Sequence, residues 1–338
     1  MKSATLEYIS EVKHHPNADK LDLVKIKGWQ VCVKRGEFKE GDLSVYIRTD
    51  TILEECPQYE FLRNKSFKIK PIKLRGQLSE GIAFPTSILK EFGSDIVVLD
   101  EDISGTDVSS LVKASHYEKP IPTNLSGQIK GYLPQFLRKT DEENIENIVD
   151  VITELKGKPY YIAEKVDGSS GTFYVKDDKF GVCSRNLELK EDDNNGFWKI
   201  ARKYDIENKL KHHFKGRNIC IQGEVYGPGI QGNLLGVGEL SFALFNLWDI
   251  DDQFYMNYID LVNFSKVSDI PMVSVLEESD NFDKTVEELH SIANNLKYPN
   301  GHVAEGIVVR PQIGFISRIM KQHCSFKVKN EEFKLKHD

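Results

Sequence analysis

One strand–turn–strand segment constrains the fold of this 338-residue chain more than any other feature. Residues 160–175 read YYIAEKVDGSSGTFYV, in which an apolar run leads into Glu164 and Lys165. Asp167 and Gly168 then form a turn, and a second strand-like run comes after it. The four letters K-x-D-G, taken alone, are more typical of a solvated hairpin. The interpretation of Lys165 therefore depends on residues further along the chain.

Five further strings come in order after this segment. SRN covers residues 184–186, ICIQGEVYG ends an apolar run near Glu224, and SFALFNLWDI contains Phe245. AEGIVVRP places Glu305 just before another apolar run, and SFKVKN supplies two lysines near the end. A carboxylate beside a buried strand is costly when it has no partner, which favours a metal or cation next to Glu224 and Glu305. Phe245 is equally compatible with a core strand.

These strings resemble the motifs of the covalent nucleotidyltransferases, a superfamily of DNA ligases, RNA ligases and mRNA capping enzymes. The resemblance implies that Lys165 bonds covalently to a nucleotide, that Arg185 or its neighbour Asn186 reaches the ribose or a phosphate, and that Phe245 stacks on the purine. The nucleotide-binding residues that it implies are Glu164, Lys165, Arg185, Glu224, Phe245, Glu305, Lys327 and Lys329.

The chemistry of lysine nucleotidylation explains these residue types. The nucleophile must be neutral, yet the unperturbed pKa of lysine is about 10.4. Nearby cations, namely a bound metal with Lys327 and Lys329, would disfavour the protonated form of Lys165. Lys165 would then attack the α-phosphate of ATP while pyrophosphate leaves in line. Lys327 and Lys329 are two apart on a predicted strand, so they point to one face and could neutralise that phosphate. Hard oxygen ligands for Mg²⁺ or Mn²⁺ are Asp167, Glu224 and Glu305.

The domain organisation predicted from the pattern is α+β in two parts. Residues 1–110 alternate with period two between glycine turns, as in LDLVKIKGWQVCVKRG, which predicts a small OB-type β-barrel. Residues 111–130 are predicted to be a linker. Residues 131–338 are predicted to be a nucleotidyltransferase domain of antiparallel sheets and helices, in which residues 139–157 open with a helix capped by Thr140 or Asp141.

Charge is distributed unevenly, although the formal net charge is −7. A basic stretch, hereafter the basic track, consists of Arg63, Lys65, Lys68, Lys70, Lys73 and Arg75. Such a track could follow an RNA phosphate backbone, but lysines on a solvated strand face are about equally compatible with it. Five dispersed cysteines, no apolar run of about 20 residues and no signal-peptide profile indicate an intracellular chain without a membrane span.

The order of the two parts distinguishes members of the superfamily. Capping enzymes and DNA ligases carry an OB domain after the catalytic core, whereas here the barrel precedes it and nine residues follow Lys329. FLRKTDEENIENI and GPGIQGN are similar to RNA ligases of the Naegleria and Deinococcus type, and VKHHPNADKLDLVKI and KLRGQLSEGI resemble OB domains attached to tRNA synthetases and tRNA-binding proteins. The resemblance implies an ATP-dependent ligase that joins 3′-OH and 5′-phosphate RNA ends through lysyl-AMP. A nicked duplex or structured RNA is the expected substrate, RNA repair the expected use, and a monomer the default state.

Two other classes of protein stay open on the sequence. A GTP-using nucleotidyltransferase of the capping type is disfavoured because no C-terminal OB domain follows the core. A non-catalytic tRNA-binding or RNA-binding protein is disfavoured because every charged position of the motifs is present. Labelling with ATP or GTP separates both alternatives from an ATP-dependent ligase.

Overall fold

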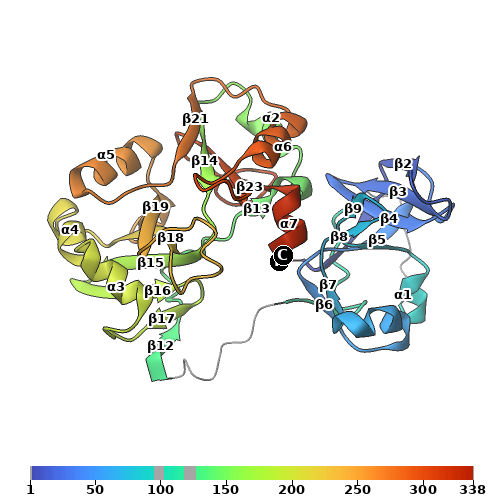
Figure 1. Ribbon diagram of the computed structural model, residues 1–338, viewed down its shortest axis with the longest axis horizontal. Helices are drawn as coiled ribbons and strands as arrows, with labels where there is room; N and C mark the ends of the chain where they lie inside the picture. The colour runs from blue at the N-terminus through green and yellow to red at the C-terminus, as the bar shows by residue number, and fades with distance from the viewer. Residues whose placement is uncertain (1, 95–102, 118–126, 338) are drawn as a thin grey trace. The chain divides into compact units, whose positions relative to one another are not determined.

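The computed structural model describes residues 2–94, 103–117 and 127–337, and the chain divides into two compact units (Figure 1). Unit 1 consists of Met1–Pro120, Glu146–Val149 and Lys334–Asp338, and unit 2 of Ile121–Ile145 and Asp150–Phe333. Residues 118–126, which belong to the predicted linker, lie outside the described residues. None of the helices in the described ranges is long and apolar enough to cross a membrane.

Unit 1 is built from short strands, as the alternating pattern predicted. Its sheets run β1-β5-β10, β2-β3-β4, β11-β6-β7 and β8-β9. The strand bounds are β1 (Ala4–Tyr8), β2 (Glu11–His14), β3 (Leu21–Ile26), β4 (Trp29–Lys34), β5 (Leu43–Ile47), β6 (Thr51–Leu53), β7 (Lys68–Ile69), β8 (Ile72–Leu74), β9 (Gln77–Ser79), β10 (Ile82–Pro85) and β11 (Ala114–His116). Unit 1 also contains a 3₁₀ helix, η1 (Pro57–Lys65), and a short α-helix, α1 (Ile88–Glu91).

Alternation on β4 fixes one face of unit 1 against its core. Trp29, Val31 and Val33 are buried, while the residues between them are only partly buried. Because side chains on a strand point alternately to opposite faces, this pattern places one apolar face inward. Trp29 also donates its indole N–H to Asn147 Oδ1 at 2.6 Å.

A lysine from the end of the chain is buried in unit 1. Lys334 is 4% exposed, and its Nζ lies 2.6 Å from Glu80 and 3.3 Å from Glu146. Burial acts to lower the pKa of Lys334, but the two carboxylates outweigh it and raise that pKa. The last helix, α7 (Glu331–His337), carries this lysine.

Unit 2 contains two mostly antiparallel sheets that together carry the motifs. The larger sheet has the order β12-β17-β16-β15-β18-β19-β20, and the smaller one β13-β23-β22-β14-β21. The larger sheet comprises β12 (Ile129–Tyr132), β15 (Ser169–Lys176), β16 (Lys179–Ser184), β17 (Leu187–Leu189), β18 (Ile219–Tyr226), β19 (Ser241–Asp249) and β20 (Phe254–Tyr255). The smaller sheet comprises β13 (Glu143–Asn144), β14 (Tyr160–Lys165), β21 (Val275–Ser279), β22 (Gly306–Pro311) and β23 (Phe326–Lys329).

Helices cover both sheets of unit 2 (Figure 1). α3 (Gly196–Lys203) and α4 (Ile206–His213) contact β16 and β15, and α5 (Tyr258–Ser268) contacts β19. α6 (Val286–Asn295) contacts β22 and β23. A capping box begins α6, in which Thr285 accepts from the Glu288 N–H and Glu288 accepts in return. The α+β prediction is confirmed.

The helix predicted over residues 139–157 is wrong in its first half. Only α2 (Val151–Leu155) is α-helical there, while β13 pairs in parallel with β23 and a 3₁₀ turn, η3 (Ile145–Asn147), follows it. Ile145 is fully buried at this point. Pairing with a strand about 180 residues away has therefore overridden the local helical pattern.

Candidate active site

The turn that carries Lys165 connects the two sheets of unit 2. β14 ends at Lys165 in the smaller sheet, and β15 begins at Ser169 in the larger one. Gly168 fits this turn because a Cβ there would lie 2.5 Å from the Val225 carbonyl oxygen on β18. The absence of a side chain thus lets the K-x-D-G turn approach β18 closely.

Lys165 lies among charged groups from three neighbouring strands. Its Nζ is 2.7 Å from Glu305 Oε2, and Glu305 is 8% exposed. Strand pairing explains the proximity, because Lys165 pairs with Gly306 and Gly306 pairs with Lys329. Lys329 Nζ consequently lies 3.9 Å from Glu305 Oε1. Lys165 and Lys329 thus both pair with the carboxylate of Glu305.

The electrostatics of Lys165 and Lys327 differ. Burial acts to lower the pKa of Lys165, but Glu305, Glu224 and Asp167 outweigh it, so that this pKa is raised. Burial also lowers the pKa of Lys327, and the charges of Lys329 and Lys165 lower it further. The protonated form of Lys165 is therefore favoured in this arrangement, whereas the protonated form of Lys327 is less favoured than in water.

Glu224 faces the same charge cluster from the larger sheet. It lies on β18 opposite Ser170, two residues after the K-x-D-G turn. Burial raises the pKa of Glu224 to about 8, opposed by Lys165 and reinforced by Glu305 and Asp167. The structure thus gathers the three predicted metal ligands around one lysine.

The donor set suits a hard divalent cation, although it is not a preassembled cage. Within the described ranges, no three His, Cys, Asp or Glu side chains are close enough to hold a metal by themselves. Mg²⁺ usually keeps several waters and takes only one or two protein carboxylates. Asp167, Glu224 and Glu305 would fit such a mixed shell with one or two of them bound directly and the rest through water.

Phe245 lies on β19 in an apolar cluster beside the strand of Lys165. The cluster includes Tyr161, Ala163, Val166 and Val273, and Phe245 packs against it partly buried. Tyr161 and Ala163 share the face of β14 from which Lys165 projects, because the three positions are spaced two residues apart. An apolar surface thus continues from Lys165 to the ring of Phe245.

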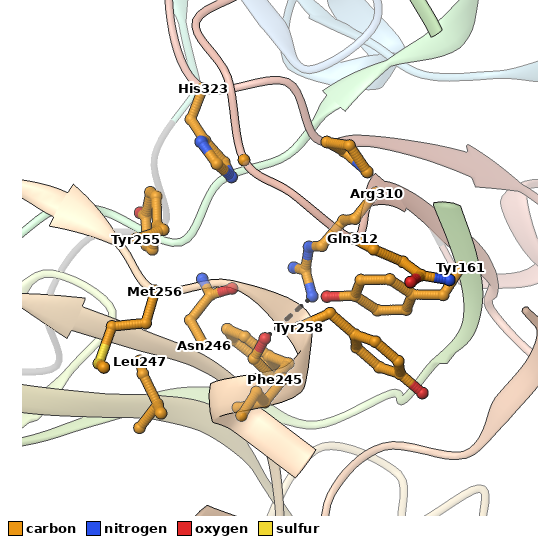
Figure 2. A pocket seen from close by; sticks show the side chains of 13 residues that line it. Tyr161, Phe245, Asn246, Leu247, Tyr255, Met256, Tyr258, Arg310, Gln312 and His323 are labelled. Atoms are coloured by element: carbon orange, nitrogen blue, oxygen red, sulfur yellow. Dashed lines mark hydrogen bonds between the residues drawn. The ribbon is translucent and has the colours of Figure 1, made fainter. Parts of the chain in front are cut away.

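Arg310 hydrogen-bonds to the backbone of Phe245. Figure 2 shows its guanidinium beside the Phe245 ring, and the dashed line marks its 3.2 Å hydrogen bond to the Phe245 carbonyl. Arg310 also donates to Ser325 Oγ at 2.8 Å and to Glu142 Oε1 at 2.6 Å. The cavity in Figure 2 has a volume of about 20 Å³, enough for roughly one water.

The remaining predicted nucleotide-binding residues lie at the edge of this cluster. Arg185 follows β16, is exposed, and pairs with Asp141 at 2.7 Å. Its charge helps to lower the pKa of Glu224, behind the larger effects of burial and Lys165. Glu164 is partly buried at the end of β14, and burial raises its pKa.

The basic track lies in unit 1 and runs from the last turn of η1 through β7 and β8 to the turn before β9. Arg63 pairs with Glu55 and Glu60, which partly neutralise it. Lys68 Nζ lies 3.9 Å from the ring centre of Tyr117. The side chains of Lys65, Lys70, Lys73 and Arg75 are exposed.

Two residues of this region were not predicted from the sequence. Tyr298 hydrogen-bonds to the backbone beside Lys165 and Glu305, and Arg310 pairs with Glu142 behind Phe245. The arginine inside the apolar string AEGIVVRP was a usable signal, because a buried cation requires a partner. Tyr298 had no such signal, since one tyrosine among 13 carries no distinguishing pattern.

Comparisons with known proteins agree with this geometry. The family model described as RNA ligase matches residues 158–329, and an OB-fold domain model matches residues 3–86. These matches confirm the predicted barrel and catalytic fold. No curated protein sequence matches the chain.

Solved structures of Naegleria gruberi RNA ligase are similar over the whole length. An apo mutant has a TM-score of 0.86 and 32% identity, covering 100% of this chain and 99% of that one. The enzyme with PPi has a TM-score of 0.85 and 32% identity, with the same coverage. A mutant with ATP and Mn has a TM-score of 0.86 and 32% identity, covering 99% of both chains. The motif region and the full-length similarity place this chain in the RNA ligase family.

Proposed function

We propose that this chain seals RNA 3′-OH and 5′-phosphate ends with ATP, through an AMP bound covalently to Lys165. The main observation in support is that Lys165 Nζ lies 2.7 Å from Glu305, in a chain that matches the RNA ligase family model over residues 158–329. The similar Naegleria structures contain ATP or AMP with Mn, which supports the same nucleotide and a divalent metal here.

In the first step the Lys165 amine attacks the α-phosphorus of ATP. A nitrogen–phosphorus bond forms, the bond to the pyrophosphate oxygen breaks, and the amine gives up its proton to solvent. The neighbouring carboxylates favour protonated Lys165, so their charge must be offset before attack. A divalent cation held by Asp167, Glu224 and Glu305 would supply that offset and stabilise charge on the phosphate.

Lys327 and Lys329 are proposed to bind the α-phosphate. They project from the same face of β23, and Lys329 lies 3.9 Å from the carboxylate that contacts Lys165. Positive charge already in place where negative charge develops lowers the barrier without reorganisation. Phe245 offers a stacking surface for the adenine, and Arg185 a contact for the ribose or a phosphate.

The later steps require an RNA 5′-phosphate and a 3′-hydroxyl. The 5′-phosphate oxygen takes AMP from Lys165, breaking the nitrogen–phosphorus bond and freeing the lysine. The 3′-hydroxyl then attacks that phosphate, AMP leaves, and the strand is joined. A nick in duplex or structured RNA presents both ends together, so we propose RNA repair as the use of this activity.

Incubation with α-labelled ATP or GTP and a divalent metal tests the first step. The protein should acquire label from ATP, and Lys165→Ala should acquire none. Label from GTP instead would support the capping-type alternative, and no label in the wild type would support a non-catalytic RNA-binding protein. Sealing of a nicked RNA duplex by the labelled protein tests the remaining steps.

The basic track is proposed to contact the RNA phosphate backbone. Lys68→Glu with Lys73→Glu should weaken RNA binding and flatten its salt dependence, since each lost phosphate contact changes the logarithmic slope by about 0.9 for duplex. The matched control reverses two exposed lysines of the same unit outside the track, Lys34 and Lys39. Equal sealing and binding by the track variant and the control would contradict the proposal.

We further propose that the protein acts inside the cell as a monomer. All five cysteines are free thiols, which suits a reducing compartment. Size-exclusion chromatography with light scattering measures the oligomeric state, and a dimer mass at micromolar concentration would contradict it.

A further inference from the structure

Tyr298 connects two segments of the active site through its hydroxyl group. It lies after α6, seven residues before Glu305, and is 2% exposed. Its hydroxyl oxygen accepts the backbone N–H of Asp167 at 3.0 Å and the backbone N–H of Glu305 at 3.2 Å. It donates to the carbonyl oxygen of Lys165 at 3.2 Å.

These three contacts use the full hydrogen-bonding capacity of a phenol. The group has one donor and two acceptor positions, and each has one backbone partner. A saturated, buried hydroxyl of this kind holds its partners in one geometry.

The partners belong to two segments that must be aligned for adenylylation. Lys165 and Asp167 bracket the K-x-D-G turn, whereas Glu305 begins the segment leading into β22. The Lys165 carbonyl and the Asp167 N–H set where that turn points. The hydrogen bond from the Glu305 N–H fixes the backbone position of Glu305, whose carboxylate lies 2.7 Å from Lys165 Nζ.

Tyr298 is itself fixed by its own backbone. Its N–H donates to the His302 carbonyl at 2.8 Å, and its carbonyl accepts from the Gly301 N–H at 2.8 Å. An isolated bridge between Lys297 and Val303 closes the same turn. The ring therefore extends into the site from a closed turn. If the hydroxyl group is removed, this turn is not free to move and replace the lost contacts.

We infer that Tyr298 is a positioning residue for lysine adenylylation, whose hydroxyl holds the Lys165–Asp167 turn in register with Glu305. This inference rests on the proposed roles of Lys165, Asp167 and Glu305. Tyr298 does not touch the reacting atoms, and it acts through the backbone of residues that do. Its loss should consequently slow the chemical step more than it weakens ATP binding.

The test compares Tyr298→Phe with a matched control, Tyr160→Phe. Tyr160 is also 2% exposed, lies on β14, and donates its hydroxyl to the Glu277 side chain, away from the turn. Single-turnover labelling with ATP gives the rate at saturation and the half-saturating ATP concentration. Tyr298→Phe should lower the saturating rate about 10- to 100-fold, because small misplacements of reacting groups cost up to about that much. Its half-saturating ATP concentration should stay within about twofold of the wild type.

The control separates positioning from stability. Tyr160→Phe should lose a comparable free energy of unfolding while labelling at the wild-type rate. Tyr298→Phe labelling at the wild-type rate would overturn the inference, as would a loss of rate in both variants that follows their loss of stability. Rates are measured at a temperature where circular dichroism shows each variant folded.

Two additions keep every outcome informative. If Tyr298→Phe does not fold, Tyr298→His is measured instead, and a folded histidine variant at the wild-type rate contradicts the inference while a slow one supports it. Wild type and Lys165→Ala are run in parallel. Absence of label in the wild type contradicts the proposed function and, with it, the inference, whereas normal Lys165-dependent labelling by Tyr298→Phe contradicts only the inference.

Discussion

Arg310→Met is expected to be among the most destabilising substitutions in unit 2. Arg310 is 6% exposed, and the partners of its guanidinium include Glu142 at 2.6 Å, Ser325 at 2.8 Å, the Phe245 carbonyl at 3.2 Å and the Tyr161 side chain. Hydrogen bonds to a charged group contribute about 1.5–3 kcal/mol each. Removing one partner of a buried ion pair costs about 3–5 kcal/mol, because the other charge stays buried without compensation. The two figures describe partly the same interactions and are not added, so we expect a loss of about 3–5 kcal/mol, the figure for the broken pair.

A double-mutant cycle shows whether this loss arises from the ion pair. Adding Glu142→Gln to Arg310→Met removes the stranded charge and should recover about 1–3 kcal/mol of it, a coupling typical of residues in one network. Urea unfolding followed by circular dichroism measures each free energy by linear extrapolation. Arg202→Met, which breaks an exposed pair with Glu191, is the control and should leave the unfolding midpoint nearly unchanged.

Two results would refute this reasoning. An Arg310→Met loss below about 1 kcal/mol would show that the buried pair contributes no more than a surface pair. Strict additivity of Arg310→Met and Glu142→Gln would show that the two charges do not depend on each other. Because Arg310 also binds the Phe245 carbonyl, a folded Arg310→Met should need more ATP for half-maximal labelling.

Two further predictions concern stability in the two units. Burial and the charge of Arg310 lower the pKa of His323 from 6.5 to about 4. The contribution of neutral His323 to stability is therefore complete above pH 6.5 and is lost as the pH falls from 6.5 through 4. The free energy of unfolding lost in this way is at most about 3 kcal/mol. His323→Gln should reduce this decline of stability at acid pH, the acid limb, when it is measured by urea unfolding. Lys334→Met leaves two buried carboxylates without their cation and should cost unit 1 about 3–5 kcal/mol. Fluorescence of Trp29, whose ring lies 5.5 Å from Lys334 Nζ, reports the unfolding.

Each of these two predictions, for His323 and for Lys334, has an outcome that would contradict it. An acid limb of the same slope in His323→Gln and the wild type would show that another group controls that pH range. Unchanged unfolding of Lys334→Met would mean that the carboxylates are compensated by other groups of unit 1.

The residues proposed for the active site were identified from the order of the motifs along the chain, and strand pairing explains why they lie close together. Lys327 and Lys329 share a face on β23, and β14 and β23 flank β22, so Glu305 lies between two lysines. Each of these residues also stands out in the sequence as a charge beside an apolar run. Period-two alternation identified the barrel strands for the same reason.

The parts that could not be predicted depend on single long-range contacts. Residues 143–144 form a strand because β23 offers an edge, although the local sequence has the composition of a helix. Tyr298 acts through one hydroxyl on backbone groups more than 130 residues away, and nothing in its sequence neighbourhood indicates it. Such contacts appear only once the chain is folded.

The central claim, that Lys165 is the residue that carries AMP, is tested most directly by locating the adduct. The protein is incubated with ATP and Mn²⁺ without RNA, digested under conditions that preserve phosphoramidates, and mapped by tandem mass spectrometry. We predict an added AMP on Lys165 alone, lost when pyrophosphate is added back. AMP on Lys327 or Lys329, or an adduct that persists in Lys165→Ala, would contradict the claim.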